Sequence, residues 1–391
     1  MATVHVLNGR QKKLIHGHPW VYGNEIERIE GEPADGELVE TVDFRGRFLG
    51  YGLYNSNSLL RVRLLTHDRT EVTEELIRSR VRSAVRARQP VLDRPGTDSC
   101  RLIYGEADRL PGVICDRFGP VTVLQVLTLG MEKYTELIAD TLVECVQPAC
   151  LYLANDDRIR EKEGMTCYAR EYFGTLPDPV MIEENGIRMQ VDIRGGQKTG
   201  SFLDQKANHL YLRQFCRGAR VLDCFSYAGG FALNAAAAGA AEVTAVDISE
   251  AAVSLIRTNA DLNGLRVNAV CRNAFDYLRE QVRQGTGYDV VVLDPPAFTK
   301  AHANLENACR GYKEIALSAM RLLSPGGILA THSCSYHMPE ETFLNTVYSA
   351  AQDLHRQVQL IDLRRQDTDH PVLAGYPESY YLKSVWLRML D

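Results

Sequence analysis

The sequence predicts an α/β protein in three parts: a small N-terminal β domain, a central α/β domain and a larger C-terminal domain built on a parallel sheet. Strand-like runs dominate the first part, residues 98–185 mix strands with a helix, and strands alternate regularly with helices after Gly186. Such alternation is typical of a parallel sheet covered by helices on both faces. We place the domains at residues 1–70, 71–185 and 186–391.

Composition and length restrict the class of protein. At 391 residues the chain exceeds one ordinary core, and its 45% hydrophobic and 24% charged residues are typical of globular proteins. No run of about eighteen apolar residues is present to span a bilayer, and the N-terminal segment lacks a signal peptide's apolar stretch. We therefore expect a cytoplasmic protein without a membrane partner. The net charge of −6 restricts any nucleic-acid contact to a local basic surface.

The ten cysteines are scattered, with no Cys-x-x-Cys pair and no cluster with histidine at zinc spacing. Neither a disulfide framework nor a bound metal is therefore predicted. In a reducing compartment most of these cysteines are expected to be small buried residues.

The N-terminal β domain is predicted from three strand-like runs, at residues 39–43, 48–54 and 59–65. In the third run, apolar residues alternate with Arg61 and Arg63. This alternation would place both arginines on the solvated face of a strand.

Two groups of basic residues are candidates for a surface that faces nucleic acid. Arg10, Lys12 and Lys13 precede Trp20, and we assign them to substrate binding; their alternative role is a solvated rim around a packed tryptophan. A helix expected over residues 70–88 carries acidic residues early and arginines late, as the helix dipole favours. Its arginines could form a phosphate-facing ridge, although a charged helix face is more often only solvated.

The central domain is predicted from strands at residues 121–126 and 150–153, with a helix at 131–146 between them. The charged residues Asp156, Asp157, Arg160 and Glu163 follow the second strand. We expect them in an ion-paired surface loop and not in a site.

The turn after the first strand of the C-terminal sheet has the features of a cofactor site. Strand 220–225 leads into a turn at residues 226–231, where two adjacent glycines let the backbone lie against a ligand. The dinucleotide fingerprint and the P-loop motif are both absent, so a ligand without pyrophosphate fits better. The next strand ends at Asp247, where a carboxylate can accept both hydroxyls of a ribose. These features predict S-adenosylmethionine bound in a Rossmann-like, seven-stranded class I methyltransferase fold.

The predicted cofactor residues follow strand ends or lie in a polar, glycine-rich segment upstream of the sheet. They are Asp204, Gln205, Asp223, Phe225, Ser226, Tyr227, Gly229, Gly230, Phe231, Asp247, Ile248, Asn273, Ala274 and Asp294. Asp204 or Gln205 would reach the amino-acid end of the cofactor, unless that segment is a simple β-turn. Asn273 would lie at the adenine, although it would serve equally as a helix cap.

The motif Asp294-Pro295-Pro296-Ala297-Phe298 follows a hydrophobic strand and would lie beside the methyl donor. The prolines remove backbone donors and stiffen the turn, which leaves carbonyl groups and the Asp294 carboxylate to face an amine or a ring nitrogen. Methyltransferases acting on exocyclic amines and on ring atoms share such motifs, so the target atom stays open. We predict substrate contacts from Pro295, Pro296, Phe298 and Lys300, with Phe298 either stacking on the base or lying in the core.

About forty residues later, Ser333-Cys334-Ser335 follows another predicted strand. A pyrimidine ring carbon is a poor nucleophile, so its methylation needs a thiolate that first adds to the neighbouring carbon. Cys334 is the candidate thiolate and, with Asp294, the candidate catalytic pair. An unperturbed cysteine has a pKa near 8.5, which the site would have to lower. His332 and His337 lie close in sequence, but we expect both to be hydrogen-bonded structural residues.

Together these motifs resemble the RlmI-type bacterial 23S ribosomal RNA cytosine-C5 methyltransferases. The resemblance spans nearly the whole chain and rests on the number and order of the motifs. They are Gly17-His18-Pro19-Trp20-Val21, Gly105-Glu106-Ala107-Asp108, Leu110-Pro111-Gly112, Lys198-Thr199-Gly200, Leu203-Asp204-Gln205, Asp294-Pro295-Pro296-Ala297-Phe298 and Ser333-Cys334-Ser335.

The resemblance implies an N-terminal RNA-binding PUA domain, a small β-barrel, before the central and methyltransferase domains. It also implies Cys334 as the nucleophile and Asp294 as the acid that contacts the base. Related RNA cytosine-C5 methyltransferases often carry a second cysteine three residues after the acid. Here that position is Ala297, so the route of proton removal and product release stays open.

The implied partner is 23S ribosomal RNA, either free or in a ribosomal assembly particle. The target cytosine and the oligomeric state, a homodimer included, are left open. Two alternatives also remain. An RNA methyltransferase acting on amino or ring nitrogens would share Asp294 but need no thiol, whereas a non-catalytic RNA-binding assembly factor would keep only the cofactor pocket.

Overall fold

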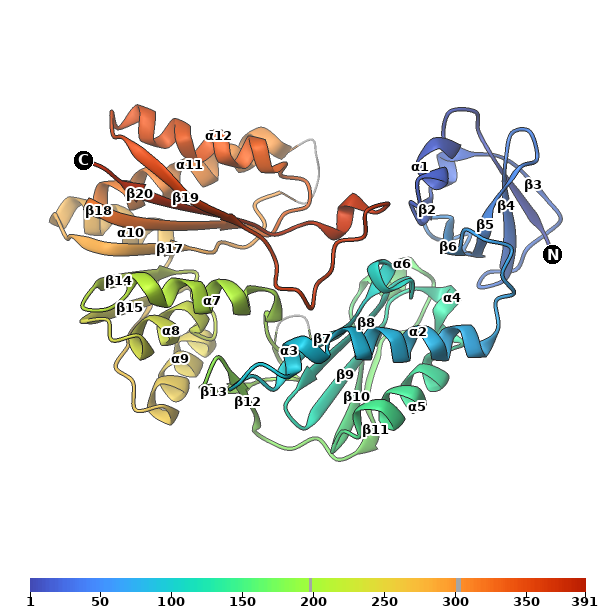
Figure 1. Ribbon diagram of the computed structural model, residues 1–391, viewed down its shortest axis with the longest axis horizontal. Coiled ribbons are helices and arrows are strands. Elements are labelled where there is room, and N and C mark those ends of the chain that lie inside the picture. Colours follow the sequence, from blue (N-terminus) through green and yellow to red (C-terminus); the bar gives the residue numbers. More distant parts are fainter. Residues whose placement is uncertain (197–198, 300–303) are drawn as a thin grey trace. The chain divides into compact units, whose positions relative to one another are not determined.

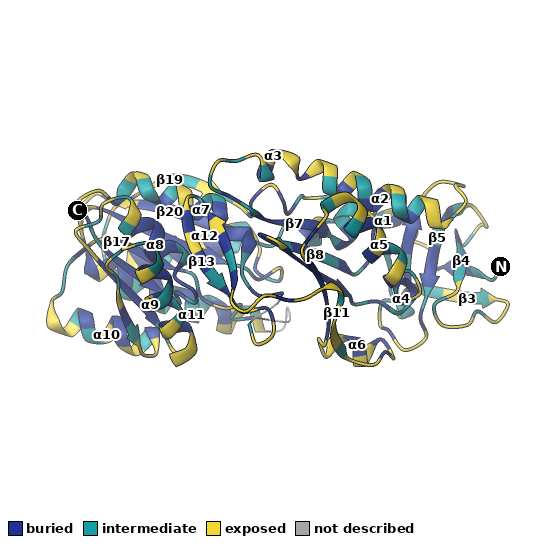
Figure 2. Ribbon diagram, turned by 90° about the horizontal axis from the view of Figure 1, so that it is seen from below, coloured by how far each residue is buried: buried dark blue, intermediate teal, exposed yellow. Residues whose placement is uncertain are grey.

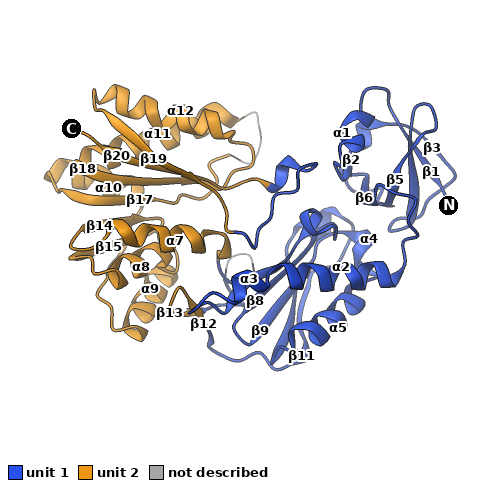
Figure 3. Ribbon diagram, viewed as in Figure 1, with its two compact units in different colours: residues 1–182, 191–201, 368–379 blue, residues 183–190, 202–367, 380–391 orange. Residues whose placement is uncertain are grey.

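The structure is a computed structural model that describes residues 1–196, 199–299 and 304–391 (Figure 1). It divides into two compact units, which Figure 3 colours separately. Unit 1 consists of Met1–Ile182, Val191–Ser201 and Thr368–Ser379, and unit 2 consists of Glu183–Gln190, Phe202–Asp367 and Tyr380–Asp391. Two short segments within the predicted C-terminal domain therefore pack with the N-terminal half of the chain.

The N-terminal part of unit 1 is a six-stranded sheet with the order β2-β6-β5-β4-β1-β3. Only β1 and β4 pair in parallel. The elements are β1 (Thr3–Val6), α1 (Gln11–Ile15), β2 (Trp20–Val21), η1 (Gly23–Glu25), β3 (Ile26–Glu30), β4 (Leu38–Asp43), β5 (Phe48–Tyr54) and β6 (Val62–Thr66). Their inward-facing apolar side chains form one buried cluster, as the period of two along a strand requires. The three predicted strands are confirmed, the third beginning three residues later than expected.

The central part of unit 1 contains a five-stranded sheet with the order β11-β10-β9-β8-β7. Its elements are α2 (Glu74–Ala87), α3 (Gln89–Leu92), β7 (Ser99–Tyr104), η2 (Gly105–Asp108), β8 (Val113–Phe118), β9 (Val121–Val126), α4 (Leu129–Glu132), α5 (Thr135–Val146), β10 (Cys150–Asn155), α6 (Ile159–Lys162) and β11 (Tyr168–Gly174). The strands β12 (Val180–Glu184) and β13 (Ile187–Val191) follow. The predicted strand at residues 121–126 is confirmed, whereas the predicted helix at 131–146 is two helices.

Three charged residues expected at solvated positions are buried or nearly buried in unit 1. Arg63 donates to Glu106 at 3.3 Å and to Glu163 at 2.9 Å. Arg160 is fully buried and donates to both carboxylate oxygens of Glu132 at 2.9 Å. The expected solvated face for Arg63 and the expected surface position of Arg160 and Glu163 were therefore wrong. The expected ion pairing of Arg160 and Glu163 is confirmed, and Asp156 and Asp157 are exposed. Alternation along a strand tells which face a side chain takes, but not which other element covers that face.

The arginines of the predicted 70–88 helix do not form a common phosphate-facing ridge, because two of them, Arg80 in α2 and Arg88 at its C-terminal cap, are buried. Arg80 donates to the backbone carbonyls of Leu65 and Arg109. Arg88 donates through both terminal nitrogens to Asp108, at 2.8 and 2.5 Å. These two arginines stabilise the packing of unit 1, and their buried guanidinium groups are not available to contact an RNA backbone.

Unit 2 contains a seven-stranded sheet with the order β16-β15-β14-β17-β18-β20-β19, which confirms the predicted seven-stranded sheet. Six strands run in the same direction, and β20 is antiparallel to both neighbours. The strands are β14 (Arg220–Cys224), β15 (Glu242–Asp247), β16 (Asn268–Cys271), β17 (Tyr288–Leu293), β18 (Leu323–Ser333), β19 (Val358–Arg364) and β20 (Lys383–Met389).

Helices cover both faces of this sheet (Figure 1). One face carries α7 (Lys206–Leu212), α8 (Gly230–Ala237) and α9 (Glu250–Leu262), and the other carries α10 (Ala274–Gln284), α11 (Leu305–Leu322) and α12 (Glu340–Asp353). Along β17, Val290 and Val292 face the first group while Val291 and Leu293 face the second. The central strands are therefore buried on both sides (dark blue in Figure 2), which explains their continuous apolar runs. Within the described ranges, no helix combines the length and apolar character needed to cross a membrane.

Candidate active site

The predicted site residues of unit 2 gather at the carboxyl edge of the seven-stranded sheet. From β14 the chain continues to β15 on one side, whereas β17 pairs with β14 on the other side. The order of strands therefore reverses between β14 and β17. In open α/β sheets ligands bind at this kind of switch point, outside the carboxyl ends of the strands.

The turn between β14 and α8 is held in a strained backbone conformation. Phe225 and Tyr227 have φ angles of +66° and +47°, which side-chain-bearing residues rarely adopt, and Gly229 has φ +89°. The amides of Phe225 and Ser226 both donate to the carbonyl of Val246, at 2.9 and 3.1 Å. Such positive φ values cost about 1–3 kcal/mol each and cluster at ligand sites. The turn at residues 225–229 is therefore shaped for a ligand as well as for packing.

Asp223 lies beneath this turn. It is fully buried, and its Oδ2 atom accepts from the Ser226 hydroxyl and from the Ala232 amide at 3.1 Å. Burial raises the pKa of Asp223 to about 7, although the Ser226 hydrogen bond opposes that rise. Asp223 thus joins the turn to the first turn of α8, and its contact with the cofactor stays a prediction.

Gly230 and Phe231 pack inward, against a histidine. A Cβ atom at Gly230 would lie 2.3 Å from Cε1 of His209, so only glycine fits there. The Phe231 ring lies 4.4 Å from the His209 ring and 5.0 Å from the His332 ring. His209 in turn shares a 2.6 Å hydrogen bond with the buried carboxylate of Glu184. Direct cofactor contact by Gly230 and Phe231 stays a prediction.

Asp247, at the end of β15, presents a fixed carboxylate. Its two oxygens each accept one backbone amide, from Tyr227 and from Ser249, both at 2.9 Å. Each carboxylate oxygen retains further acceptor capacity. The next residue, Ile248, is 69% exposed. A fixed carboxylate beside an exposed apolar side chain suits the ribose and the adenine of an adenosine.

Asn273 caps α10, its Oδ1 atom accepting from the Phe275 amide at 2.9 Å and from the Asp276 amide at 3.4 Å. The predicted helix-cap role of Asn273 is confirmed, while its contact with adenine stays a prediction. Ala274 is buried in the first turn of the same helix.

Three acids come together at the edge: Asp204, Asp223 and Asp294. Burial raises the pKa of Asp294 to about 7, and the negative charges of Asp204 and Asp223 add to that rise. Gln205 lies close enough to Asp294 to oppose it. An acid cluster with raised pKa values favours a bound cation, and S-adenosylmethionine carries an ammonium and a sulfonium. The edge therefore fits this cofactor in charge.

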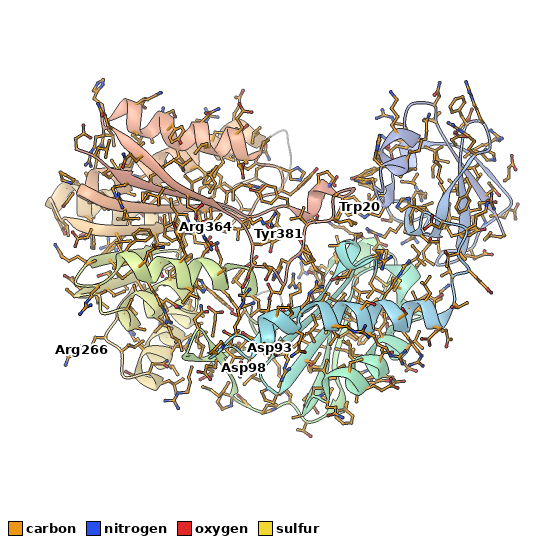
Figure 4. All side chains as sticks on the ribbon, viewed as in Figure 1. Trp20, Asp93, Asp98, Arg266, Arg364 and Tyr381 are labelled. Carbon is orange, nitrogen blue, oxygen red and sulfur yellow. The ribbon has the colours of Figure 1, made fainter. Side chains whose placement is uncertain are left out.

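Asp204 is also tied to residues far along the chain. Its Oδ2 atom accepts from the Tyr381 hydroxyl, and its carbonyl accepts from the Asp367 amide at 2.9 Å. Tyr381, labelled in Figure 4, lies just before β20.

The loops that follow β17 and β18 are fastened together at this edge. The Ser335 hydroxyl donates to the Thr299 carbonyl at 2.9 Å, and the Ser333 hydroxyl shares a 2.9 Å hydrogen bond with the Tyr312 hydroxyl. Cys334, between the two serines, is partly exposed. The structure thus brings Cys334 and Asp294 to one edge, as predicted from two strand ends.

The remaining residues of the proline motif are less suited to base contact than predicted. Phe298 is half-buried, with its ring 4.6 Å from that of Tyr312 and 5.8 Å from that of Phe275. This packing favours the core role over the stacking role. Pro296 is exposed and Pro295 is buried. The predicted substrate residue Lys300 lies outside the described residues.

His332 differs from the expectation of a hydrogen-bonded histidine. It is fully buried, and neither ring nitrogen has a hydrogen-bond partner among the described residues. Burial lowers its pKa to about 3, with His209 adding to the effect, so the ring is neutral. The expectation was wrong because the ring packs on Phe231 and Trp386 instead of finding a polar partner.

Sequence reasoning missed Lys383, the first residue of β20. Its side chain is 2% exposed, and Nζ donates to the backbone carbonyls of Ser335 at 2.5 Å and Tyr381 at 2.8 Å. The available signal was a single lysine at the start of an otherwise apolar predicted strand.

The basic residues near the N-terminus divide into exposed and engaged groups. Arg10 and Lys12 are exposed on and beside α1. Lys13, by contrast, forms a 2.8 Å ion pair with Glu25. Of these three basic residues, Arg10 and Lys12 therefore have the exposed position that was predicted for all of them.

Trp20 belongs to a packed cluster in unit 1, as its alternative role required. Its indole N–H donates to Glu106 at 2.8 Å, and its ring lies 4.8 Å from that of Tyr376 (Figure 4 labels Trp20). His18 shares a hydrogen bond with Glu378 at 3.2 Å. The segment 368–379 thus packs on the N-terminal sheet.

Comparison with known proteins agrees with this geometry. Residues 4–67 match the PUA-like domain family, and residues 148–367 match the S-adenosylmethionine-dependent methyltransferase family. The protein named ribosomal RNA large subunit methyltransferase I from Aeromonas salmonicida is 40% identical over 390 residues, covering 98% of both chains. Its namesake from Klebsiella pneumoniae (strain 342) is 41% identical over 387 residues, covering 98% of this chain and 97% of its own.

Solved structures share the fold of the whole chain. A protein from Streptococcus mutans assigned as a SAM-dependent methyltransferase has a TM-score of 0.85 at 21% identity, covering 99% of this chain and 100% of its own. A structure of SMU.776, solved with SAH, has a TM-score of 0.86 at the same identity and coverage. With a PUA-like domain, a methyltransferase sheet and an acidic edge suited to a cationic cofactor, the chain belongs to the S-adenosylmethionine-dependent methyltransferase family that includes ribosomal RNA large subunit methyltransferase I.

Proposed function

We propose that this protein methylates C5 of a cytosine in 23S ribosomal RNA, through a covalent adduct with Cys334, in the bacterial cytoplasm. One observation carries the proposal: Ser335 binds the Cys334 loop to the carbonyl of Thr299, so a thiol and the Asp294 motif share one sheet edge with the cofactor turn. The names of the relatives support ribosomal RNA as the substrate.

The thiol is needed because C5 of cytosine is a weak nucleophile. Attack of the Cys334 thiolate on C6 forms an S–C6 bond and moves the C5–C6 π electrons toward C5. S-adenosylmethionine supplies the electrophilic methyl group. Loss of the C5 proton to a base then restores the C5–C6 double bond, and the S–C6 bond breaks to return the thiolate.

Asp294 is suited to hold the ring during this attack. With a pKa of about 7, its carboxyl group is protonated in a large fraction of molecules near neutral pH. A protonated carboxyl donates a hydrogen bond to a ring nitrogen, where negative charge collects when a thiolate adds to C6. Asp294 therefore serves as hydrogen-bond donor to the base.

The test uses 23S ribosomal RNA from cells that lack the protein, with 5-fluorocytosine at the mapped target position. Fluorine cannot leave as a proton does, so enzyme and RNA should stay joined after methyl transfer. Cys334→Ala should give neither adduct nor product, whereas Cys309→Ala, which changes a half-buried cysteine on α11, should give both. Continued methylation by Cys334→Ala would instead support a methyltransferase acting on amino or ring nitrogens, and RNA binding without any methylation would support an assembly factor.

A further inference from the structure

Lys383 and Cys334 are brought together by strand pairing. In the antiparallel ladder between β18 and β20, Lys383 lies opposite Ser333, the residue before Cys334. The Lys383 ammonium donates to the carbonyl of Ser335, the residue after Cys334. Lys383 therefore contacts the chain on both sides of Cys334 and sets the path of the loop that carries the thiol.

The charge of Lys383 is unusually placed for a structural lysine. An ammonium has three N–H donors, and the carbonyls of Ser335 and Tyr381 take two of them. Among the residues that the structure describes, no carboxylate lies within 4.0 Å of its Nζ atom. The acid of α12 that acts on it, Glu340, accepts a hydrogen bond from the Tyr380 hydroxyl. A buried cation without an adjacent carboxylate favours an anion at the nearest titratable group.

The titratable group whose charge acts most strongly on Lys383 is Cys334. Burial lowers the pKa of Lys383 to about 8, and the negative charges of Cys334 and Glu340 oppose the fall. Among the residues that the structure describes, Tyr312 of α11 also interacts electrostatically with Cys334, and Asp294 interacts with Tyr312. Near pH 7 Lys383 is therefore largely an ammonium that acts on Cys334.

We propose that Lys383 is a positioning residue for Cys334, whose ammonium fixes the 333–335 loop and stabilises the thiolate form of the cysteine. An adjacent cation lowers the pKa of a thiol because it favours the charged form. The catalytic consequence rests on the proposed function of Cys334 as nucleophile. The charge coupling itself is measurable without any methyl transfer.

The test measures the rate of Cys334 alkylation by iodoacetamide against pH in the full-length protein, read by peptide mass spectrometry. Lys383→Gln keeps donors for the two carbonyls but removes the charge, so the alkylation midpoint should rise by about one pH unit, and the rate at pH 7 should fall about tenfold. Lys383→Arg should restore the parent midpoint. Exposed Cys271 is the internal reference, and Arg388→Met, which removes an exposed charge from the same strand, is the matched control.

An unchanged midpoint in Lys383→Gln, with parental cofactor affinity and thermal unfolding, would overturn the proposal. If Lys383→Gln does not fold, Lys383→Met is compared with Lys383→Arg, and equal midpoints in that pair overturn it as well. The pH dependence of methylation separates the proposed role of Lys383 from the proposed role of Cys334 as nucleophile. When Cys334 is the nucleophile, Lys383→Gln loses about tenfold in rate at pH 7 and recovers toward pH 9. When Cys334 is not the nucleophile, the alkylation midpoint of Lys383→Gln still rises, but the pH dependence of methylation is the same as in the parent.

Discussion

In unit 1 buried acids such as Glu106, Asp116 and Glu163 are paired with arginines, whereas at the sheet edge of unit 2 acid lies beside acid. Asp116 is fully buried, and burial alone would raise its pKa, yet its two 2.8 Å hydrogen bonds from Arg101 hold that pKa below the usual value. Asp223 and Asp294 form no ion pair with an arginine in the described part of the chain, and their pKa values rise to about 7. Buried charges in opposite pairs stabilise the fold without a ligand, whereas clustered acids indicate a site that a bound cation stabilises.

Breaking a pair should cost more than any change at the edge. Arg101→Met would leave the Asp116 carboxylate buried without its counter-ion, which typically costs about 3–5 kcal/mol. We expect that loss in the free energy of unfolding of unit 1, measured by urea denaturation. Arg82→Met, which removes an exposed arginine of α2, should change it by less than about 1 kcal/mol. Equal effects of the two substitutions would contradict the distinction between paired and solvated charges.

The next effect concerns the ribose acceptor. Asp247→Ala should weaken S-adenosylmethionine binding by about 1.5–3 kcal/mol, roughly ten- to a hundredfold, because a charge-assisted hydrogen bond is removed. Calorimetry on the full-length protein measures this change. Asp276→Ala, an exposed acid on α10, serves as the control and should bind like the parent. A parental affinity for Asp247→Ala would remove this residue from the site.

A smaller effect tests the acid cluster through its protons. Raised pKa values mean that Asp223 and Asp294 hold protons near pH 7 in part, with Asp204 raising the pKa of Asp294 and His209 opposing the rise of both. A cation lowers those pKa values, so binding should release part of the protons that the two acids hold, leaving a protonated fraction of Asp294 for the base, and affinity should increase as pH rises from about 6 to about 8. Calorimetry in two buffers of different ionisation enthalpy counts the protons. SAH, which lacks the sulfonium charge, should release fewer; equal release by both ligands would contradict the electrostatic role of the cluster.

The smallest expected effect concerns the salt dependence of RNA binding, compared between a paired and two exposed basic residues. Because Lys13 is already paired with Glu25, replacing it by alanine should leave the salt dependence of RNA binding nearly unchanged. The double variant Arg10→Ala/Lys12→Ala should reduce the slope of log K against log salt by up to about 0.7–0.9 for each phosphate that the protein no longer neutralises. Filter binding at several salt concentrations measures the slopes. A larger change for Lys13→Ala than for the double variant would reverse this assignment.

The sequence was sufficient for the features that depend on neighbours along the chain. Apolar runs that end in Cys224, Asp247 and Ser333 predicted strand ends at those residues, and the sheet topology then brought their loops together. The placement of Asp247 and Cys334 at one edge followed from this periodicity alone.

Features that depend on distant residues could not be predicted in the same way. Arg63 and Arg160 are arginines whose carboxylate partners lie on other elements, and nothing local distinguishes them from solvated ones. Gly230 was predicted as a ligand contact, but its requirement for glycine comes from His209 on α7. Lys383 likewise acquires its neighbours only when β20 pairs with β18.

Asp204 has a second consequence for how variants of this protein are interpreted. Its carbonyl accepts a hydrogen bond from the Asp367 amide, and its carboxylate accepts one from the Tyr381 hydroxyl. Asp367 and Tyr381 flank segment 368–379, which the chain contributes to unit 1, so one residue fixes both ends of that segment. Substituting Asp204 with alanine removes a carboxylate from the acid cluster and also removes the hydrogen bond that fixes Tyr381 at one end of that segment. Loss of activity in such a variant therefore has two possible causes, the lost acid and the released segment. Tyr381→Phe removes the hydrogen bond but keeps the carboxylate, so this variant separates the two causes.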